Sequence, residues 1–159
     1  MKILYLINHR PFFVSHRLPI ALKMQSEGHQ VHLLSGKSND KNMEKYAEKQ
    51  LKKNKIKSNV LDFNSATISL FKSIKTFFYT YKFIKKFNPD LIHSASMKAI
   101  ILSGLCCLLM KKPIIIAFSG FGYIFTETGN IKIQFLKIII KILLQIIFLN
   151  KKKTCNCTK

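Results

Sequence analysis

Short apolar segments alternate along the chain with longer segments that are polar or amphipathic. Near-continuous runs of Ile, Leu, Val and Tyr are typical of strands that are buried on both faces of a parallel sheet. The predicted strands are Lys2–Asn8, Gln30–Ser35, Ile56–Phe63, Leu91–Ala95 and Ile114–Phe118.

The segments that follow these strands have helical patterns. Strict alternation of strand and helix, without hairpin signals, predicts an α/β fold with a doubly wound, mostly parallel sheet and helices on both faces. The predicted helices are Ser15–Glu27, Asp40–Asn54, Ala66–Phe87, Lys98–Met110 and Ile131–Leu149.

The first predicted helix has recognisable ends. Ser15 is placed to act as its N-cap, and Pro19 falls in the first turn, where a missing N–H breaks no intrahelical hydrogen bond. Gly28 follows the last turn and is placed as the C′ residue.

The predicted helix Ala66–Phe87 is amphipathic, with lysines recurring on its polar face. The pattern fits either a core helix with a solvated face or a helix whose basic stripe touches a membrane. The predicted helix Asp40–Asn54 has few apolar residues and should be exposed. The apolar face of the predicted helix Ala66–Phe87 consists of Leu70, Ile74, Phe77, Phe78, Tyr81 and Ile84.

The segment Ile131–Leu149 is almost wholly Ile, Leu and Phe, with a narrow polar stripe of Gln134, Lys137, Lys141 and Gln145. It is long enough to span a bilayer, but two lysines near its middle would each cost about 2.5–3.5 kcal/mol there. We therefore expect a helix that is buried against a missing partner or that lies in a membrane interface.

Charge and composition narrow the classes of function. The chain has 159 residues, 48% of them hydrophobic, which supports one folded domain, and its formal net charge is +20. This charge fits an anionic partner such as lipid headgroups or a phosphorylated substrate. A nucleic-acid partner is disfavoured, because nearly all the cations are lysines and no groove-reading motif is present. The same composition also fits an A/T-rich coding sequence.

The four cysteines form neither a disulfide framework nor a zinc pattern, and no secretory signal opens the chain. We expect reduced thiols and a cytoplasmic protein.

Candidate site residues follow the predicted strands. Loops at the carboxyl ends of parallel strands open at one edge of the sheet, where ligands bind in open α/β folds. The four loop regions predicted at this edge are Phe12–Arg17, Gly36–Asn39, Ser94–Lys98 and Ser119–Tyr123. His16 and Arg17 follow the first strand, His93 ends the fourth, and Lys98 opens a helix. The first two fit either an anion site at a helix N-terminus or an ordinary solvated loop. His93 fits either a catalyst or a structural histidine.

No Walker loop, nucleophile elbow or HExxH helix is present. Gly120 and Gly122, in the loop after the fifth strand, would let a ligand approach the backbone closely, but two glycines alone are weak evidence for phosphate binding.

Several of these segments together resemble the start of family 4 glycosyltransferases, which have the GT-B fold and build bacterial surface polysaccharides. The similarity extends from Met1 to about Leu149. It is carried by Phe12–Ala21, Glu27–Val31, Asn88–His93, Lys98 and Ser119–Phe125.

The resemblance implies a Rossmann-like domain, one of a GT-B pair, that binds the acceptor. The second domain of the pair would hold the nucleotide-sugar through an E-x7-E element and a basic residue. Transfer would retain the anomeric configuration and need no metal or cofactor besides the nucleotide-sugar co-substrate. The acceptor would often be a sugar on a polyprenyl pyrophosphate, which suits a protein that is peripheral on the inner face of the cytoplasmic membrane. The implied acceptor-side residues are His16, Arg17, His93, Lys98, Gly120 and Gly122.

Two positions depart from the family's pattern. Many relatives have a second histidine two places after His93, where this chain has Ala95. Many also have a Gly-Gly turn after the first strand, where this chain has Arg10–Phe12.

The end of the chain departs further. We expect residues 1–149 to form the acceptor-binding domain and residues 150–159 to be a polar tail produced by a frameshift. Lys151–Lys153 implies an A-rich run, and the codons of Thr154–Thr158, read one base later, allow the strand-like peptide His-Val-Ile-Val-Gln. A chain truncated in this way would lack the donor domain and be inactive alone. The alternative is a non-catalytic, membrane-associated partner subunit of a split glycosyltransferase.

Overall fold

The computed structural model describes residues 1–63, 70–118, 131–149 and 154–156. The described strands are β1 (Lys2–His9), β2 (Gln30–Gly36), β3 (Lys57–Val60), β4 (Leu91–Ala95), β5 (Ile114–Ala117) and β6 (Thr154–Asn156). The described helices are α1 (Arg10–His16), α2 (Leu18–Ser26), α3 (Lys41–Lys53), α4 (Leu70–Phe87), α5 (Met97–Met110) and α7 (Ile131–Leu149).

The described strands form one parallel sheet in the order β3-β2-β1-β4-β5-β6. The strand order reverses between β1 and β4, so the segments that follow these two strands lead to opposite faces of the sheet. Open α/β sheets bind ligands at the carboxyl ends of the strands at such a switch point. We call this expected ligand-binding region the crevice. The doubly wound, parallel α/β fold expected from the sequence is confirmed.

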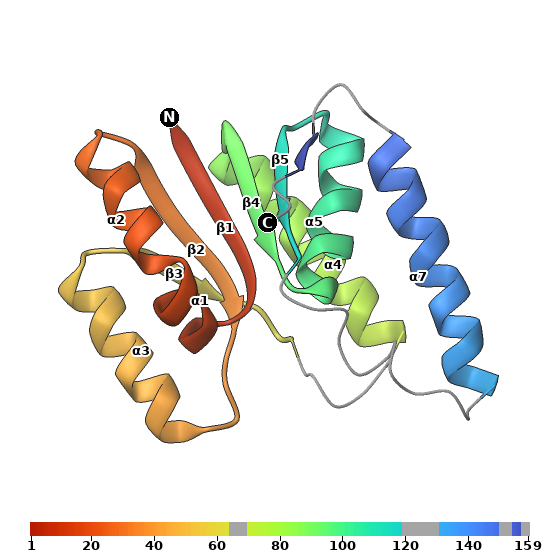
Figure 1. The fold of residues 1–159 in the computed structure, drawn as a ribbon, viewed down its shortest axis with the longest axis horizontal. Coiled ribbons are helices and arrows are strands. Elements are labelled where there is room, and N and C mark those ends of the chain that lie inside the picture. Colours follow the sequence, from red (N-terminus) through yellow and green to blue (C-terminus); the bar gives the residue numbers. More distant parts are fainter. Residues whose placement is uncertain (64–69, 119–130, 150–153, 157–159) are drawn as a thin grey trace.

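The helices cover the sheet in two layers (Figure 1), with α1, α2 and α3 on one side and α4, α5 and α7 on the other. Because side chains alternate along a strand, β1, β2, β4 and β5 each contribute residues to both cores. Tyr5 and Leu33 belong to the core under α1, α2 and α3, whereas Leu4 and Ile92 belong to the core under α4, α5 and α7.

The segment after β1 differs from the predicted loop and single helix. Helix α1 begins at Arg10, directly after β1, and Arg17 separates it from α2. His9 caps α1 by accepting a hydrogen bond from the Phe12 amide at its Nδ1 (3.4 Å). Ser15 is therefore no N-cap: it lies in the last turn of α1, and its hydroxyl donates to the carbonyl oxygen of Pro11 (2.9 Å).

The other two signals of this region are confirmed. Pro19 occupies the first turn of α2. Gly28 has φ +82°, the left-handed conformation of a C′ residue. Its amide donates to the carbonyl of Gln25 (3.0 Å) and that of His29 donates to Met24 (3.0 Å), which is the hydrogen-bond pattern of a Schellman motif.

Helix α4 buries only part of its predicted apolar face. Phe77, Tyr81 and Ile84 pack on the core, but Ile74 and Phe78 are exposed. These two residues lie in the first half of the helix, where no core contact covers them. The predicted start of this helix, residues 66–69, lies outside the described residues.

Helix α3 is mostly exposed, as predicted, and Asp40 caps it by accepting hydrogen bonds from the amides of Asn42 and Met43. It nevertheless buries Glu44, Ala47 and Leu51. Strand β3 is shorter than predicted, because only Lys57–Val60 pairs with β2.

Helix α7 has the predicted bounds and packs against α5. Gly104 makes this contact possible, because a Cβ at that position would lie 2.5 Å from the Cδ1 atom of Ile147. No described helix, α7 included, is long and apolar enough to cross a membrane. Within the predicted polar tail, Thr154–Asn156 forms β6 beside β5, so a strand forms here in the given sequence without a shifted reading frame.

Candidate functional site

Three of the four predicted loop regions at the carboxyl edge of the sheet are described. The segment Phe12–Arg17 belongs to α1 and its junction with α2, whereas Gly36–Asn39 follows β2 and Ser94–Lys98 joins β4 to α5. Gly120 and Gly122 lie outside the described residues, so their predicted role stays a prediction.

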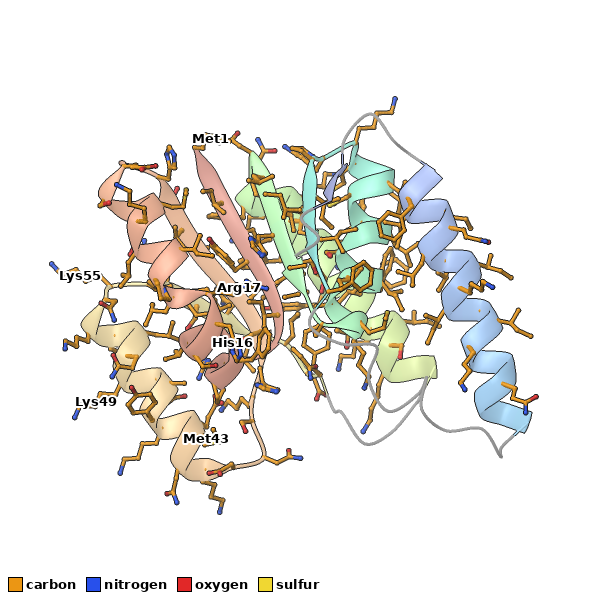
Figure 2. All side chains as sticks on the ribbon, viewed as in Figure 1. Met1, His16, Arg17, Met43, Lys49 and Lys55 are labelled. Atoms are coloured by element: carbon orange, nitrogen blue, oxygen red, sulfur yellow. The ribbon has the colours of Figure 1, made fainter. Side chains whose placement is uncertain are left out.

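Arg17 and His93 come together beside Tyr5. Tyr5 and His93 are register partners on the neighbouring strands β1 and β4, and their rings stack with centroids 5.0 Å apart. Arg17 lies at the junction of α1 and α2 (Figure 2), and its guanidinium is close enough to both rings to influence their pKa values. The edge of Phe13 from α1 packs on Tyr5 and closes the cluster (centroids 5.3 Å apart).

Burial determines the protonation of this cluster. It lowers the pKa of His93 to about 4, and the positive charge of Arg17 acts in the same direction. Burial also raises the pKa of the Tyr5 phenol, although Arg17 opposes this shift. At neutral pH the cluster therefore consists of one permanent cation, one neutral imidazole and one neutral phenol.

Two nitrogen atoms of the cluster have unused hydrogen-bonding capacity. Nε of Arg17 and Nε2 of His93 are buried and have no hydrogen-bond partner. Among the described residues, Arg17 forms no ion pair with a carboxylate. Burying a hydrogen-bond donor without a partner costs free energy. An oxygen atom of a bound ligand would satisfy such a donor, so its presence at the crevice fits a binding site.

His16 does not join the cluster, although it precedes Arg17 in the sequence. Its ring is exposed and stacks on Phe12 (centroids 4.4 Å apart). Its Nδ1 atom lies 2.6 Å from the hydroxyl oxygen of Ser15, within hydrogen-bond distance. His16 therefore lies at the rim of the crevice.

Lys98 lies in the first turn of α5, beyond the carboxyl end of β4. Its side chain is exposed, yet partial burial lowers its pKa. The preceding N-cap residue, Ser96, has φ +79° and makes no capping hydrogen bond, and its hydroxyl oxygen is buried without a partner. A left-handed φ at a residue other than glycine costs about 1–3 kcal/mol, and such strain gathers at functional sites.

Arg10 is a structural residue that the sequence analysis missed. Arg10 is 7% exposed, and its guanidinium pairs with the buried Glu44 (3.0 Å) and with the half-exposed Glu48, both on α3. Glu44 also accepts a hydrogen bond from the amide of Ser38 (2.9 Å). One ion cluster thus joins α1, the loop after β2 and α3. The sequence contains a signal for this ion pairing. Glu44 and Glu48, two of only seven acids, lie four residues apart on one helix, where they can share one cation.

The described residues hold no group of three His, Cys, Asp or Glu side chains that could share a metal ion. Cys106 and Cys107 are buried, and burial raises the pKa of each thiol to about 12, so neither is a nucleophile at neutral pH. The chemistry that the cluster supports is hydrogen bonding to an anionic or hydroxyl-bearing ligand.

A parallel sheet in this order with a polar crevice at its switch point defines a Rossmann-like domain of the kind that binds a ligand at its carboxyl edge. The glycosyl transferase 4-like family matches residues 2–150, and the chain belongs to this family. No curated protein matches its sequence.

Solved structures with the same fold include glycosyltransferases. Acinetobacter baumannii MurG is 18% identical, with a TM-score of 0.60 over 99% of this chain and 41% of its own. A glycosyltransferase from Rickettsia africae is 20% identical, with a TM-score of 0.63 over 98% of this chain and 36% of its own. The chain therefore spans less than half the length of both proteins.

The fold alone does not define the reaction. A deacetylase involved in teicoplanin biosynthesis also matches, with 10% identity and a TM-score of 0.62 over 96% of this chain and 86% of its own. The family match, which includes the sequence around the crevice, supports glycosyl transfer.

Proposed function

We propose that this chain is the acceptor-binding domain of a retaining glycosyltransferase, which adds a sugar from a nucleotide-sugar to a growing surface glycan. The family match supports the class of reaction. The observation that carries the assignment to the acceptor is the pair of unpartnered buried nitrogens, Nε of Arg17 and Nε2 of His93, at the switch point of the sheet.

In this proposal the cluster binds and orients the acceptor. Arg17 holds an anionic or hydroxyl oxygen by a charge-assisted hydrogen bond. Neutral His93 donates or accepts a second hydrogen bond, and stacking on Tyr5 fixes its ring plane. His16 and Lys98 contact the parts of the acceptor that extend past the rim, and Gly120 and Gly122 complete the site by resemblance.

The donor site belongs in this proposal to a second domain, in the same polypeptide or in a separate chain. Residues of that domain would hold the nucleotide-sugar above the acceptor, and transfer would need no metal. By itself this domain would then hold only one of the two substrates.

The acceptor that fits best is a saccharide linked to polyprenyl pyrophosphate on the inner face of the cytoplasmic membrane. The net charge of +20 would attract both its pyrophosphate and the anionic bilayer around it.

Binding of an acceptor analogue tests the proposal directly. The probe is farnesyl pyrophosphate-linked N-acetylglucosamine, added to the 159-residue chain while the ring signals of His93 are followed by NMR. A phosphate bound near His93 should raise its pKa from about 4, because an anion stabilises the imidazolium.

Matched variants locate the binding site. Arg17→Gln should weaken binding by about tenfold or more, since hydrogen bonds to charged groups contribute about 1.5–3 kcal/mol. Lys23→Gln removes an exposed cation of α2 and should leave affinity unchanged. Absence of binding, or equal affinity in the two variants, would refute the assignment of the acceptor site.

The alternative is a non-catalytic, membrane-associated partner subunit that recruits a separate catalytic chain. The DNA sequence beyond the codons of Lys151–Lys153 distinguishes the two. An open shifted frame that encodes an E-x7-E element supports one interrupted glycosyltransferase, and closure of both frames supports the separate subunit.

A further inference from the structure

Helix α7 has two dissimilar sides. Ile140 and Ile147 are buried, and Ile147 fits against Gly104 of α5. These contacts fix the rotation of α7 about its own axis, so the side chains that face outward are defined by the packing of the helix on the domain.

The outward side exposes four isoleucines. The exposed fractions are 56% at Ile138, 38% at Ile139, 49% at Ile142 and 47% at Ile146. Their spacing of three to four residues places them along one strip of the helix, which we call the isoleucine ridge. An exposed apolar strip of this kind marks a surface that contacts a protein partner or a membrane.

The ridge has basic but no acidic neighbours along this part of the chain. Lys141, on the same outward side, is exposed, and so are Gln134 and Gln145. No Asp or Glu follows Glu127 in the sequence, and Lys151–Lys153 comes directly after the helix. An apolar strip beside lysines, with no acid nearby, complements anionic lipid headgroups above an acyl-chain layer.

The same charges disfavour a second copy of the chain as the occupant. A symmetric contact would bring two strongly basic surfaces together, each on a chain of net charge +20.

We propose that the isoleucine ridge of α7, together with Lys141, docks the domain on an anionic bilayer surface. The ridge inserts among the headgroups, and α7 lies along the surface without crossing it. Helix α7 is at the outer end of the domain, away from α1, α2 and α3, and its first turn lies at the same end as the carboxyl edge of the sheet (Figure 1). Docking would therefore hold the crevice with Arg17 and His93 beside the membrane, not against it.

Vesicle sedimentation of the 159-residue chain tests this surface. The probes are vesicles of phosphatidylcholine with 30% phosphatidylglycerol (roughly the anionic content that polybasic surfaces need) and vesicles of phosphatidylcholine alone. We expect strong binding to the first and at least about tenfold weaker binding to the second, with salt reducing the difference.

The ridge is tested by a matched pair of double variants. Ile142→Gln/Ile146→Gln should lower the partition coefficient by about tenfold or more, because apolar surface is lost from the contact. Ile20→Gln/Met43→Gln changes similarly exposed residues on α2 and α3 (42% and 56%) and should bind as the parent chain does. Lys141→Glu should weaken binding only to the anionic vesicles.

A second readout does not depend on comparing affinities. Ile142→Cys carrying an environment-sensitive fluorophore should shift to the blue with anionic vesicles, whereas Ile20→Cys should not. Cys155 and Cys157 are replaced by serine in both, and the buried Cys106 and Cys107 react slowly because their pKa values are about 12.

Three results would overturn the proposal: no vesicle binding by the parent chain, equal binding by the two double variants, or a ridge that holds a dimer in sedimentation equilibrium and releases it in the ridge variant. The vesicles contain no saccharide acceptor, so these outcomes are independent of whether the acceptor site is correctly assigned.

Discussion

The two sides of the sheet are closed by different means. On the side of α1, α2 and α3, an ion cluster of the buried Arg10 and Glu44 with the half-exposed Glu48 joins α1 to α3. On the other side, α4, α5 and α7 are held by apolar contacts, such as that of Ile147 on Gly104. The first side has ion pairs in addition to its apolar core, whereas apolar packing dominates the second side.

The difference bears on what each side does. The ion cluster holds α1, and Arg17 directly follows this helix. The first side would therefore hold the proposed acceptor site in its binding geometry before a ligand binds. The second side ends in the isoleucine ridge, an apolar surface that extends the packing outward. In the two proposals above, the directional contacts support the acceptor site and the apolar contacts support the docking surface.

Of the changes that test this comparison, removal of the Arg10 cation should have the largest effect on the stability of the protein. Arg10→Met leaves Glu44 buried without its charged partner and should lower the free energy of unfolding by about 3–5 kcal/mol, measured by urea denaturation. Lys23→Met breaks the exposed ion pair with Glu27 (3.3 Å) and should change the free energy of unfolding by less than about 1 kcal/mol. Similar losses in both would show that the cluster does not fasten this side.

Overfilling the contact between α5 and α7 should come next. Gly104→Leu forces Ile147 away and should cost about 3 kcal/mol, the upper part of the range for overpacked cores. Amides of α7 should lose hydrogen-exchange protection before those of α2. Leu109→Ala, at an exposed position of α5, serves as the control and should change stability by no more than about 0.5 kcal/mol.

Acid should destabilise the first side through His93. Its pKa is about 4 in the folded chain, below the usual 6.5 of an unfolded histidine, so the unfolded state binds the proton more readily. The contribution of His93 to the free energy of unfolding is therefore fully present above about pH 6.5 and is lost as the pH drops towards 4. His93→Phe, which keeps a ring against Tyr5, should flatten the curve of urea midpoint against pH in this window. A smaller slope should remain, because burial also lowers the pKa of His32.

The smallest expected change is a gain. Ser96→Gly removes the cost of φ +79° without losing a capping hydrogen bond, and should raise stability by about 1 kcal/mol in thermal unfolding. No gain would mean that the positive φ of Ser96 carries no strain that glycine can relieve.

Local signals predicted the regular elements well. The bounds of β4 and α7 agree with the sequence pattern, since a buried strand and a long apolar helix are each specified by their own residues. Gly28 was placed as C′ for the same reason, because its left-handed conformation depends only on its own missing side chain.

Positions that depend on distant partners were predicted less well. The turn after β1 is a helix instead of a loop, and Arg10 in its first turn is neutralised by acids more than thirty residues away. The exposure of Phe78 on α4 depends on which neighbours reach the first half of that helix, and no pattern within the helix records this.

The sequence by itself determined the class of fold, its strand and helix periodicities and the residues that could form a site. His16 and Arg17 are neighbours in the chain and looked equivalent, and only the tertiary structure separated them. The junction of α1 and α2 directs Arg17 towards Tyr5 and His93 and leaves His16 at the rim, stacked on Phe12. The physical reason is that backbone propensity is local, whereas burial, charge and hydrogen-bonding capacity are set by groups that the fold brings together from distant parts of the chain.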